Sequence, residues 1–305
     1  MKTILYIGDF KVSYSTELYV THALRELGYK VICKQEDQYF ISDVETCVNE
    51  VLALKPILVL FSKGKPIGNS RLFIEELKKN KINTASWLFD LYFDLPVDRA
   101  YRLRIKDAPF NSDVVYTTDG GHHEQFNELK IVSKTLRQGI HEPEAILYER
   151  EMKHDVIFVG GNVYLTRTKM LDGLKERYGE KFERFGHLPD NQVRGLPLNE
   201  LYASTKIVVG DSQPSDYYWS NRLYETLGRG GFLLHPYTKG IEEEFEDGKH
   251  LVLYERDNMK DLFEKIDYYL AHDDEREKIR KAGHEHVKKH FTYKQRCIEL
   301  MKNYD

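Results

Sequence analysis

The residues best suited by type to do chemistry lie in one segment with helical spacing. Arg222 and Glu225 fall on one face of a helix predicted over 219–228. Ser220 is the predicted N-cap, which would leave free backbone N–H groups beside the forked guanidinium of Arg222. These groups suit a diphosphate, and Glu225, one turn inside the helix, is placed to accept bonds from both hydroxyls of a ribose. The residues predicted to bind a ligand here are Ser220, Asn221, Arg222 and Glu225, with Arg229 on the same polar face.

An ordinary ion pair within the helix is the alternative for Arg222 and Glu225, because an isolated Arg-x-x-Glu pattern usually forms one. The surrounding sequence favours a ligand site. Gly228 and Gly230 follow the helix at once, and a buried strand is predicted over 231–235.

A glycine turn, Gly160-Gly161, follows a strand predicted over 155–159. It is not the G-x-G-x-x-G fingerprint of dinucleotide sites. The two glycines would let the backbone approach phosphates, with Arg167 as a counter-charge, and a plain tight turn is the alternative. Gly8 has the equivalent place after the first strand of the chain, with the same two interpretations.

A hydroxyl that attacks a carbon atom must lose a proton, so a carboxylate or imidazole is also needed. Asp90 follows a strand predicted over 84–89, and Asp119 and His122 follow one predicted over 113–118. We favour Asp90 as the base, with Asp119 and His122 as the other candidates. An ordinary loop or capping position is the alternative for Asp90, and a solvent-facing loop for the histidine.

Basic residues are concentrated between residues 63 and 106, where ten Lys and Arg side chains stand against five Asp and Glu. Lys63 and Lys65 follow a predicted strand, and Arg99 and Arg102 approximate one helical face beside aromatic residues. Such a cluster is compatible with a nucleic-acid acceptor, for example a hydroxymethylated DNA base, although a solvated surface is the commoner origin. Cell-wall, spore-surface, protein and small-molecule acceptors stay open.

Strands and helices alternate along the chain in two runs that would carry these residues. Near-continuous apolar strands, such as 57–61, are typical of parallel sheets covered by helices on both faces. A polar stretch over 142–154 separates the two runs. We therefore predict two Rossmann-like α/β domains, residues 1–148 and 149–291, and a final helix over 292–305 able to cross back to the first domain.

The composition is typical of a cytosolic globular protein. The chain has 305 residues, of which 41% are hydrophobic and 31% charged, and a formal net charge of −4. We expect a cytoplasmic protein without a signal sequence or membrane span. Three cysteines far apart predict neither a disulfide framework nor a zinc ribbon, and we assign His286 and His290 to a solvated helix face, so no metal site is predicted.

Three runs in the C-terminal half, taken in order, are S-N-R-L-Y-E-T-L-G-R-G-G-F-L-L, G-I-E-E-E-F-E-D-G-K-H-L-V-L-Y and R-K-A-G-H-E-H-V-K-K-H-F-T-Y-K-Q-R. Together they resemble the C-terminal domain of the group-1 glycosyltransferases, in the branch that includes spore-maturation-type enzymes. The resemblance covers roughly residues 155–300 and implies the GT-B fold, in which two Rossmann-like parallel-sheet domains face a cleft. It further implies transfer of a sugar from a nucleotide-sugar, for which we expect a UDP-sugar such as UDP-glucose, to an acceptor hydroxyl. We expect this transfer to be metal-independent, because the chain lacks the DxD carboxylate pair with which the other large glycosyltransferase fold holds a divalent ion.

The resemblance also assigns roles by position. It implies that Glu225 binds the donor ribose, that Arg222 approaches the pyrophosphate and that the turn at Gly160 lies close to the phosphates. The chain departs from the pattern at Tyr217, where better-known retaining members carry a second glutamate. The stereochemical outcome is therefore not implied.

Two other functions compete with transfer. One is a nucleotide-sugar epimerase of the same fold, and the other is a non-catalytic nucleotide-sugar-binding or coat-assembly protein. An epimerase isomerises the free donor without an acceptor, whereas a non-catalytic member would bind nucleotide weakly or not at all.

Overall fold

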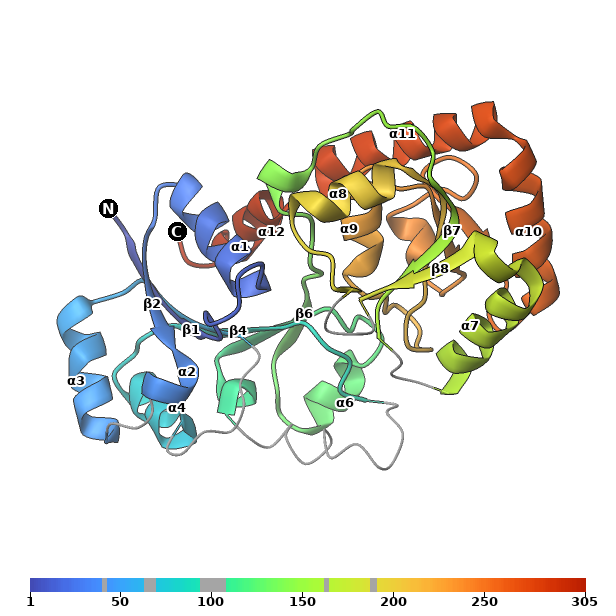
Figure 1. Cartoon of the computed structure of the whole chain (residues 1–305). Coiled ribbons are helices and arrows are strands. Elements are labelled where there is room, and N and C mark those ends of the chain that lie inside the picture. Colours follow the sequence, from blue (N-terminus) through green and yellow to red (C-terminus); the bar gives the residue numbers. More distant parts are fainter. Residues whose placement is uncertain (40–42, 63–69, 94–107, 162–164, 187–190) are drawn as a thin grey trace. The chain divides into compact units, whose positions relative to one another are not determined.

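The computed structural model describes residues 1–39, 43–62, 70–93, 108–161, 165–186 and 191–305 (Figure 1). The chain folds into two compact units, one formed by Met1–Gln138 with Tyr293–Asp305 and the other by Gly139–Thr292. Each unit is an α/β sandwich around a parallel sheet, with six strands in the first and five in the second. The predicted fold class, two Rossmann-like parallel-sheet domains, is confirmed.

The first unit has the strand order β2-β1-β3-β4-β5-β6, and all of its neighbouring strands are parallel. Alternate residues of β1 enter two different cores. Ile4 and Tyr6 pack with α1 and α12, whereas Leu5 and Ile7 pack with α3 and α4. The elements are β1 (Thr3–Gly8), α1 (Thr16–Glu26), β2 (Lys30–Gln35), α2 (Glu36–Tyr39), α3 (Val44–Leu54), β3 (Leu58–Ser62), α4 (Ser70–Lys79), β4 (Thr84–Leu88), η1 (Ala108–Asn111), β5 (Val114–Thr117), α6 (His123–Glu128), β6 (Ser133–Thr135) and α12 (Tyr293–Met301).

Local signals explain where the helices of this unit begin. Ser15 caps α1, since its side chain accepts a bond from the backbone N–H of Leu18. Asp43 caps α3 in the same way, through the N–H of Thr46 at 2.9 Å. The cap residues satisfy donors that the first helical turn leaves without an intrahelical partner.

The second unit has the strand order β11-β10-β9-β7-β8, again with parallel pairing throughout. Val208 and Leu233 enter a core with α8 and α9, and Val209 and Leu234 enter a core with α7 and α10. The elements are η2 (Glu142–Glu144), β7 (His154–Val159), α7 (Leu165–Tyr178), η3 (Gly179–Lys181), β8 (Phe182–Phe185), α8 (Leu196–Ala203), β9 (Thr205–Val209), α9 (Arg222–Gly228), β10 (Leu233–Pro236), η5 (Ile241–Glu243), β11 (Val252–Tyr254), α10 (Met259–Ala271) and α11 (Asp273–His290).

The segment around the start of the predicted polar stretch packs with the second unit. Ile140 and Ala145 belong to its core, and the N–H of Ile140 donates to the carbonyl of Phe291 at 2.9 Å. At Gly139 a Cβ atom would lie 2.4 Å from that same carbonyl oxygen, so the close approach requires glycine. The division between the units therefore lies earlier in the chain than the predicted 148/149 boundary.

The last helix, α12, packs against α1 in the first unit. Cys297, Leu300 and Met301 are buried in the core that also contains Val20 and Leu24 of α1. Within the described part of the chain, no helix combines the length and apolarity that crossing a membrane requires.

Candidate functional site

Two arginines converge at the carboxyl ends of β7 and β9. The Arg167 Nε atom donates to Asp211 Oδ2 at 2.7 Å, and Arg222 Nη1 donates to the backbone carbonyl of Asp211 at 3.2 Å. The two guanidinium carbons lie 5.5 and 5.2 Å from the ring centroid of Phe158, within range of a cation–π interaction. Phe158 and Asp211 thus hold two positive charges close together at one edge of the sheet.

Glycine at position 160 makes this arrangement sterically feasible. Gly160 has a φ angle of +147°, and a Cβ atom there would lie 2.7 Å from Arg222 Nη2. Apart from its neighbours in the chain, no described residue lies within 4 Å of where a Cβ atom would be at Gly161, and the Gly161 carbonyl accepts a bond from Arg167 Nη1 at 2.9 Å. The turn therefore admits Arg222 at Gly160, and two successive glycines leave this stretch of backbone without side chains.

Helix α9 begins at Arg222, and the N-cap prediction for Ser220 is wrong. Asn221 occupies the N-cap position with helical torsion angles, φ −53° and ψ −23°, and its side chain forms no capping hydrogen bond. Because an N-cap residue normally has an extended backbone, neither side chain is aligned with the first free N–H groups. The Ser220 hydroxyl instead lies 3.5 Å from the carbonyl of Asp211, and Asn221 Nδ2 donates to Glu225 Oε1 at 3.3 Å.

Glu225 lies one turn inside α9 and is partly exposed. Burial raises the pKa of its carboxyl group, and the positive charges of Arg229 and Arg194 oppose that shift. The ionised carboxylate is therefore costly to the protein without a ligand. A donor of hydrogen bonds, such as a ribose hydroxyl, would stabilise it.

Arg229 does not share a ligand-facing surface with Arg222, which corrects the prediction of one polar face. Its side chain is 1% exposed, donates to Asn199 Oδ1 at 2.7 Å and to the Gly195 carbonyl at 3.0 Å, and forms an ion pair with Glu144. Packing of α8 and η2 against this side of α9 encloses the guanidinium. The buried pair gives Arg229 a structural role.

The loop that joins β9 to α9 contains several buried polar atoms without a hydrogen-bond partner among the described residues. They are Ser212 Oγ, Ser215 Oγ and Asn221 Oδ1. Buried polar atoms are normally satisfied by protein, water or ligand. The loop therefore has unused hydrogen-bonding capacity beside the arginine pair.

Gly8, the predicted binding residue of the first unit, ends β1 and packs closely against two side chains. A Cβ atom there would lie 2.9 Å from Ser62 Oγ and 3.0 Å from Glu17 Cγ. Ser62 in turn donates to Glu17 Oε1 at 3.1 Å in the interior of the unit. Glycine is thus required at this position by packing alone.

A buried aspartate–histidine pair follows β5. The Nδ1 atom of His122 lies 2.8 and 2.9 Å from the two carboxylate oxygens of Asp119, which is fully buried. Because a carboxylate accepts, Nδ1 carries the proton in this contact. The ring of Phe93 stacks on His122 at 5.2 Å between centroids. This is the geometry of a general base held by a carboxylate.

The neighbouring candidates have different surroundings. Asp90 follows β4 and is exposed. His123 uses both ring nitrogens, at 2.7 Å from Ser133 Oγ and 2.7 Å from Thr135 Oγ1, and burial lowers its pKa. Of these side chains, His122 combines burial with an orienting carboxylate.

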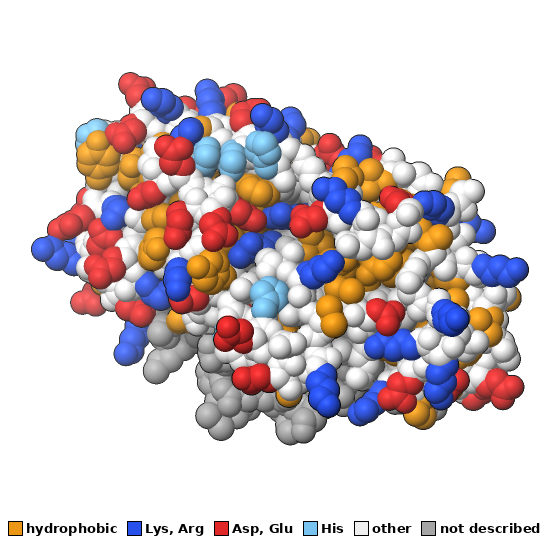
Figure 2. All heavy atoms as spheres, turned by 180° about the vertical axis from the view of Figure 1, so that it is seen from behind, with side chains coloured by type: hydrophobic (Ala, Val, Ile, Leu, Met, Phe, Trp, Pro, Cys, Tyr) orange, Lys and Arg blue, Asp and Glu red, His pale blue; other side chains and the backbone are white. Residues whose placement is uncertain are grey.

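The four predicted acceptor-binding residues, Lys63, Lys65, Arg99 and Arg102, lie outside the described residues. Figure 2 shows Lys and Arg side chains interspersed with Asp and Glu over the face it draws, without one dominant patch of a single sign. In the described part of the chain, no group of three or more His, Cys, Asp or Glu side chains is arranged to hold a metal ion.

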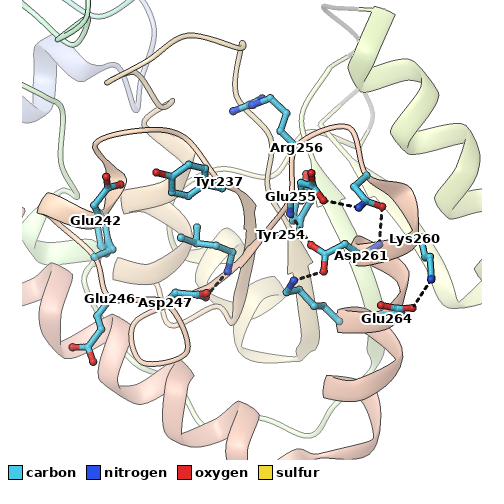
Figure 3. A pocket seen from close by; sticks show the side chains of 14 residues that line it. Tyr237, Glu242, Glu246, Asp247, Tyr254, Glu255, Arg256, Lys260, Asp261 and Glu264 are labelled. Carbon is cyan, nitrogen blue, oxygen red and sulfur yellow. Dashed lines mark hydrogen bonds and ion pairs between the residues drawn. The ribbon is translucent and has the colours of Figure 1, made fainter.

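An open groove of about 1120 Å³ flanks the edge strand β11 and is rich in carboxylates (Figure 3). Its acidic groups are engaged within the fold. Asp247 Oδ1 accepts the N–H of Leu253 at 2.8 Å, and Asp261 Oδ2 accepts the N–H of Glu255 at 2.6 Å. These side chains satisfy the backbone donors of β11 and the residue after it, which protects the edge of the sheet.

The structure thus brings together Gly160, Gly161, Arg167, Ser220 and Arg222, and it pairs Asn221 with Glu225. Sequence reasoning missed Asp211 and Phe158, which organise the arginines. Their positions in the sequence could have indicated them, because both lie at the carboxyl end of a strand. Phe158 is the penultimate residue of β7, and Asp211 is the second residue after β9.

The C-terminal half of the chain matches a known protein family, and solved structures share the fold. Residues 167–302 match the family described as glycosyl transferase-like. A glycosyltransferase from Rickettsia africae superposes with a TM-score of 0.70 at 13% identity, covering 100% of this chain and 98% of that one. The Anabaena protein Alr3699/HepE, in complex with UDP and glucose, gives 0.65 at 11% identity, with 99% of each chain covered.

A sucrose-phosphate synthase from Thermosynechococcus elongatus gives a TM-score of 0.65 at 11% identity, covering 100% of this chain and 98% of that one. No protein of curated description matches the sequence significantly. The architecture of two parallel-sheet units is that of GT-B glycosyltransferases. With the family match, these findings indicate a glycosyltransferase.

Proposed function

We propose that this glycosyltransferase transfers a sugar from a UDP-sugar to an acceptor hydroxyl, with the donor diphosphate bound by Arg167 and Arg222. The observation that carries the proposal is the pairing of these two guanidinium groups on Phe158 and Asp211. Two guanidinium groups with one carboxylate leave an excess positive charge among these three side chains, which suits a dianion. The solved complexes of Alr3699/HepE contain UDP or UDP-glucose, which supports this choice of donor.

Glu225 is the proposed ribose ligand. Its carboxylate lies one turn beyond Arg222 on α9, and burial raises its pKa. Two ribose hydroxyls donating to it would offset the cost of the buried charge. Gly160, Gly161, Ser220 and Asn221 complete the proposed donor site, with the glycine turn beside the phosphates.

We propose His122 as the catalytic base, positioned by Asp119, in preference to Asp90. In the reaction, the acceptor oxygen attacks the anomeric carbon of the sugar while its proton passes to His122 Nε2. The bond from that carbon to the diphosphate oxygen breaks, and the electron pair leaves with the diphosphate. Asp119 stabilises the imidazolium that forms, since both of its oxygens face Nδ1.

The negative charge on the leaving diphosphate is met in this proposal by Arg167 and Arg222, so transfer does not need a divalent ion. We expect activity to persist in EDTA. An enzyme that stops in EDTA and recovers with Mg²⁺ or Mn²⁺ would contradict this part of the mechanism.

We further propose, on the sequence resemblance, that the chain belongs to the spore-maturation-type branch of the group-1 enzymes. We propose a cytoplasmic location on the composition and on the three widely separated cysteines. For the acceptor we propose only a chemical class. The basic segment around Lys63 and Arg99 favours a nucleic acid. Phosphate contacts predict that acceptor binding weakens steeply with salt. Binding unchanged between low and high salt would leave the protein, cell-surface and small-molecule acceptors.

The experiment that tests the proposal is thermal denaturation with a panel of nucleoside diphosphates and nucleotide-sugars, without metal. A ligand at 100 times its dissociation constant stabilises the native state by about 2.7 kcal/mol. We expect UDP and a UDP-sugar to raise Tm. If no nucleoside diphosphate does so, the donor site is wrong, and an isomer formed from free donor without acceptor would instead indicate an epimerase.

A further inference from the structure

A half-buried phenylalanine lies against one face of the imidazole that serves as the base in the proposed mechanism. Phe93 comes after β4 and His122 comes after β5, and these two strands are neighbours in the sheet. The two rings are stacked, with 5.2 Å between their centroids and 25° between their planes. Aromatic pairs favour such an arrangement, and the separation is also within the range of a cation–π interaction once the imidazole is protonated.

Phe93 is itself held by a buried aromatic core. Its ring meets the ring of Phe126 edge-on, at 4.9 Å between centroids and 87° between planes. Phe126 is fully buried and stacks with Phe110 at 6.2 Å, and Phe110 meets Tyr92 edge-on at 5.0 Å. Because protein interiors are close-packed, a ring held in this way resists displacement. The core of the first unit therefore fixes the surface on which the imidazole rests.

The contact with Asp119 constrains His122 in a different way. Nδ1 lies 2.8 and 2.9 Å from the two carboxylate oxygens, and the carboxylate is itself fixed by the N–H of Gly121, at 3.2 Å from Oδ1. These bonds determine where Nδ1 lies. They leave the imidazole able to tilt about an axis through Nδ1, because such a tilt hardly changes either distance. A ring stacked on one face opposes that tilt, so Asp119 and Phe93 together constrain both the position and the plane of the base.

We propose that Phe93 is a positioning residue for the transfer reaction, which holds the plane of the His122 imidazole and stabilises the imidazolium that forms. The inference rests on the proposed function, since it requires His122 as the base. The face of a phenyl ring attracts an imidazolium more strongly than a neutral imidazole. The contact therefore strengthens as the acceptor proton moves to His122, and an interaction that is stronger in the transition state raises the rate rather than the affinity.

The first measurement is the rate at which the Nδ1 proton of His122 exchanges with solvent, followed by NMR in the intact chain. We expect Phe93→Leu to speed this exchange by at least about tenfold, because the imidazole loses the ring that holds it in place. Phe93→Tyr keeps an aromatic ring and should restore slow exchange. If Phe93→Leu does not fold, Phe93→Met replaces it, because methionine fills irregular space without an aromatic face.

Phe110→Leu is the matched control for this measurement. Phe110 packs on Phe126 in the same aromatic core, so its truncation should lower Tm as the truncation of Phe93 does. It should leave the exchange rate of the His122 proton close to that of the wild type. An equal acceleration in Phe110→Leu and Phe93→Leu would overturn the inference, since loss of core packing would then explain both.

The second measurement is single-turnover hydrolysis of UDP-glucose, in which water takes the place of the acceptor. Phe93→Leu should lower the rate about three- to thirtyfold and leave the affinity for UDP-glucose within about twofold. In the His122→Asn background the same change should have almost no further effect on the rate, because Phe93 acts through the imidazole.

Three results are distinguishable. Unchanged proton exchange in Phe93→Leu would overturn the inference. Rate losses of Phe93→Leu and His122→Asn that multiply in the double variant would also overturn it, because Phe93 would then act independently of the base. Hydrolysis at the wild-type rate in His122→Asn would instead reject His122 as the base, which is a failure of the proposed function.

Discussion

In the second unit, Arg167 and Arg222 are held against one ring and one aspartate, whereas in the first unit a buried aspartate holds a single histidine. The arginines keep a permanent positive charge, since a guanidinium does not lose its proton in proteins. Imidazole, in contrast, is the side chain most often used to move a proton in catalysis. In the proposed mechanism, binding a charged leaving group and moving a proton call for different side chains, and each unit supplies one of them. Variants can therefore separate the two tasks.

The largest effect is expected at His122. His122→Asn keeps a donor toward Asp119 and removes the basic nitrogen, so we expect the transfer rate to fall by about 10²–10⁴. Donor affinity should stay within about twofold, because the base acts on the acceptor. Single-turnover transfer and calorimetric donor binding measure the two quantities.

Asp90→Asn is the matched control for this prediction. It should retain transfer, since Asp90 is exposed and Asp119 already orients His122. Normal transfer in His122→Asn together with loss of transfer in Asp90→Asn would move the base to Asp90.

Arg222→Ala should reduce the transfer rate by about 10²–10³, with a smaller loss of donor affinity. The diphosphate gains charge as it leaves, so its stabilising partner matters most in the transition state. Arg177→Ala is a suitable control, since Arg177 forms a surface ion pair with Asp267. An equal loss in ground-state binding and in turnover would contradict a role centred on the leaving group.

Glu225→Gln should weaken donor binding at least about tenfold, the factor that corresponds to 1.4 kcal/mol. The same change should stabilise the unliganded protein by roughly 0.5–2 kcal/mol at neutral pH, because it removes a charge that its partly buried surroundings disfavour. The sign follows from the raised pKa of Glu225. Because the carboxyl group binds its proton more tightly in the folded protein, the folded protein loses stability as the pH rises through that pKa. Denaturation and calorimetry test both effects, and unchanged donor affinity would reject the ribose role.

The last prediction concerns stability and leaves catalysis untouched at neutral pH, since it arises at His235, a 1% exposed residue of β10 in the second unit. Burial, with help from the charges of Arg256 and Arg222, lowers its pKa to about 3. The unfolded chain binds a proton near pH 6.5 and the folded chain does not, so stability should fall as pH drops from about 6.5 toward 3. Chemical denaturation across this pH range gives the free energy of unfolding as a function of pH. We expect this free energy to change less with pH in His235→Gln than in His22→Gln, a variant at an exposed site.

Several parts of the fold were predictable from local patterns. Strand β3 is a continuous apolar run, which is why a parallel sheet covered on both faces could be predicted and is confirmed. Strand β6, Ser133–Thr135, has only three residues and a polar sequence, so no apolar periodicity indicates a strand there. It is recognised only by its pairing with β5. The capping prediction at Ser220 failed because the torsion angles of Asn221 depend on how the preceding loop packs.

The sequence by itself determined the α/β class and the residue types available at the strand ends, because apolar periodicity and glycine placement act over a few neighbouring residues. Only the tertiary structure decided which charges meet. Asp211 reaches Arg167 across 44 positions, and Arg229 is enclosed by Glu144 and Asn199 rather than presented beside Arg222. Such pairings depend on the order of strands in the sheet and on which helix covers which face, and residue spacing along one helix contains no information about either.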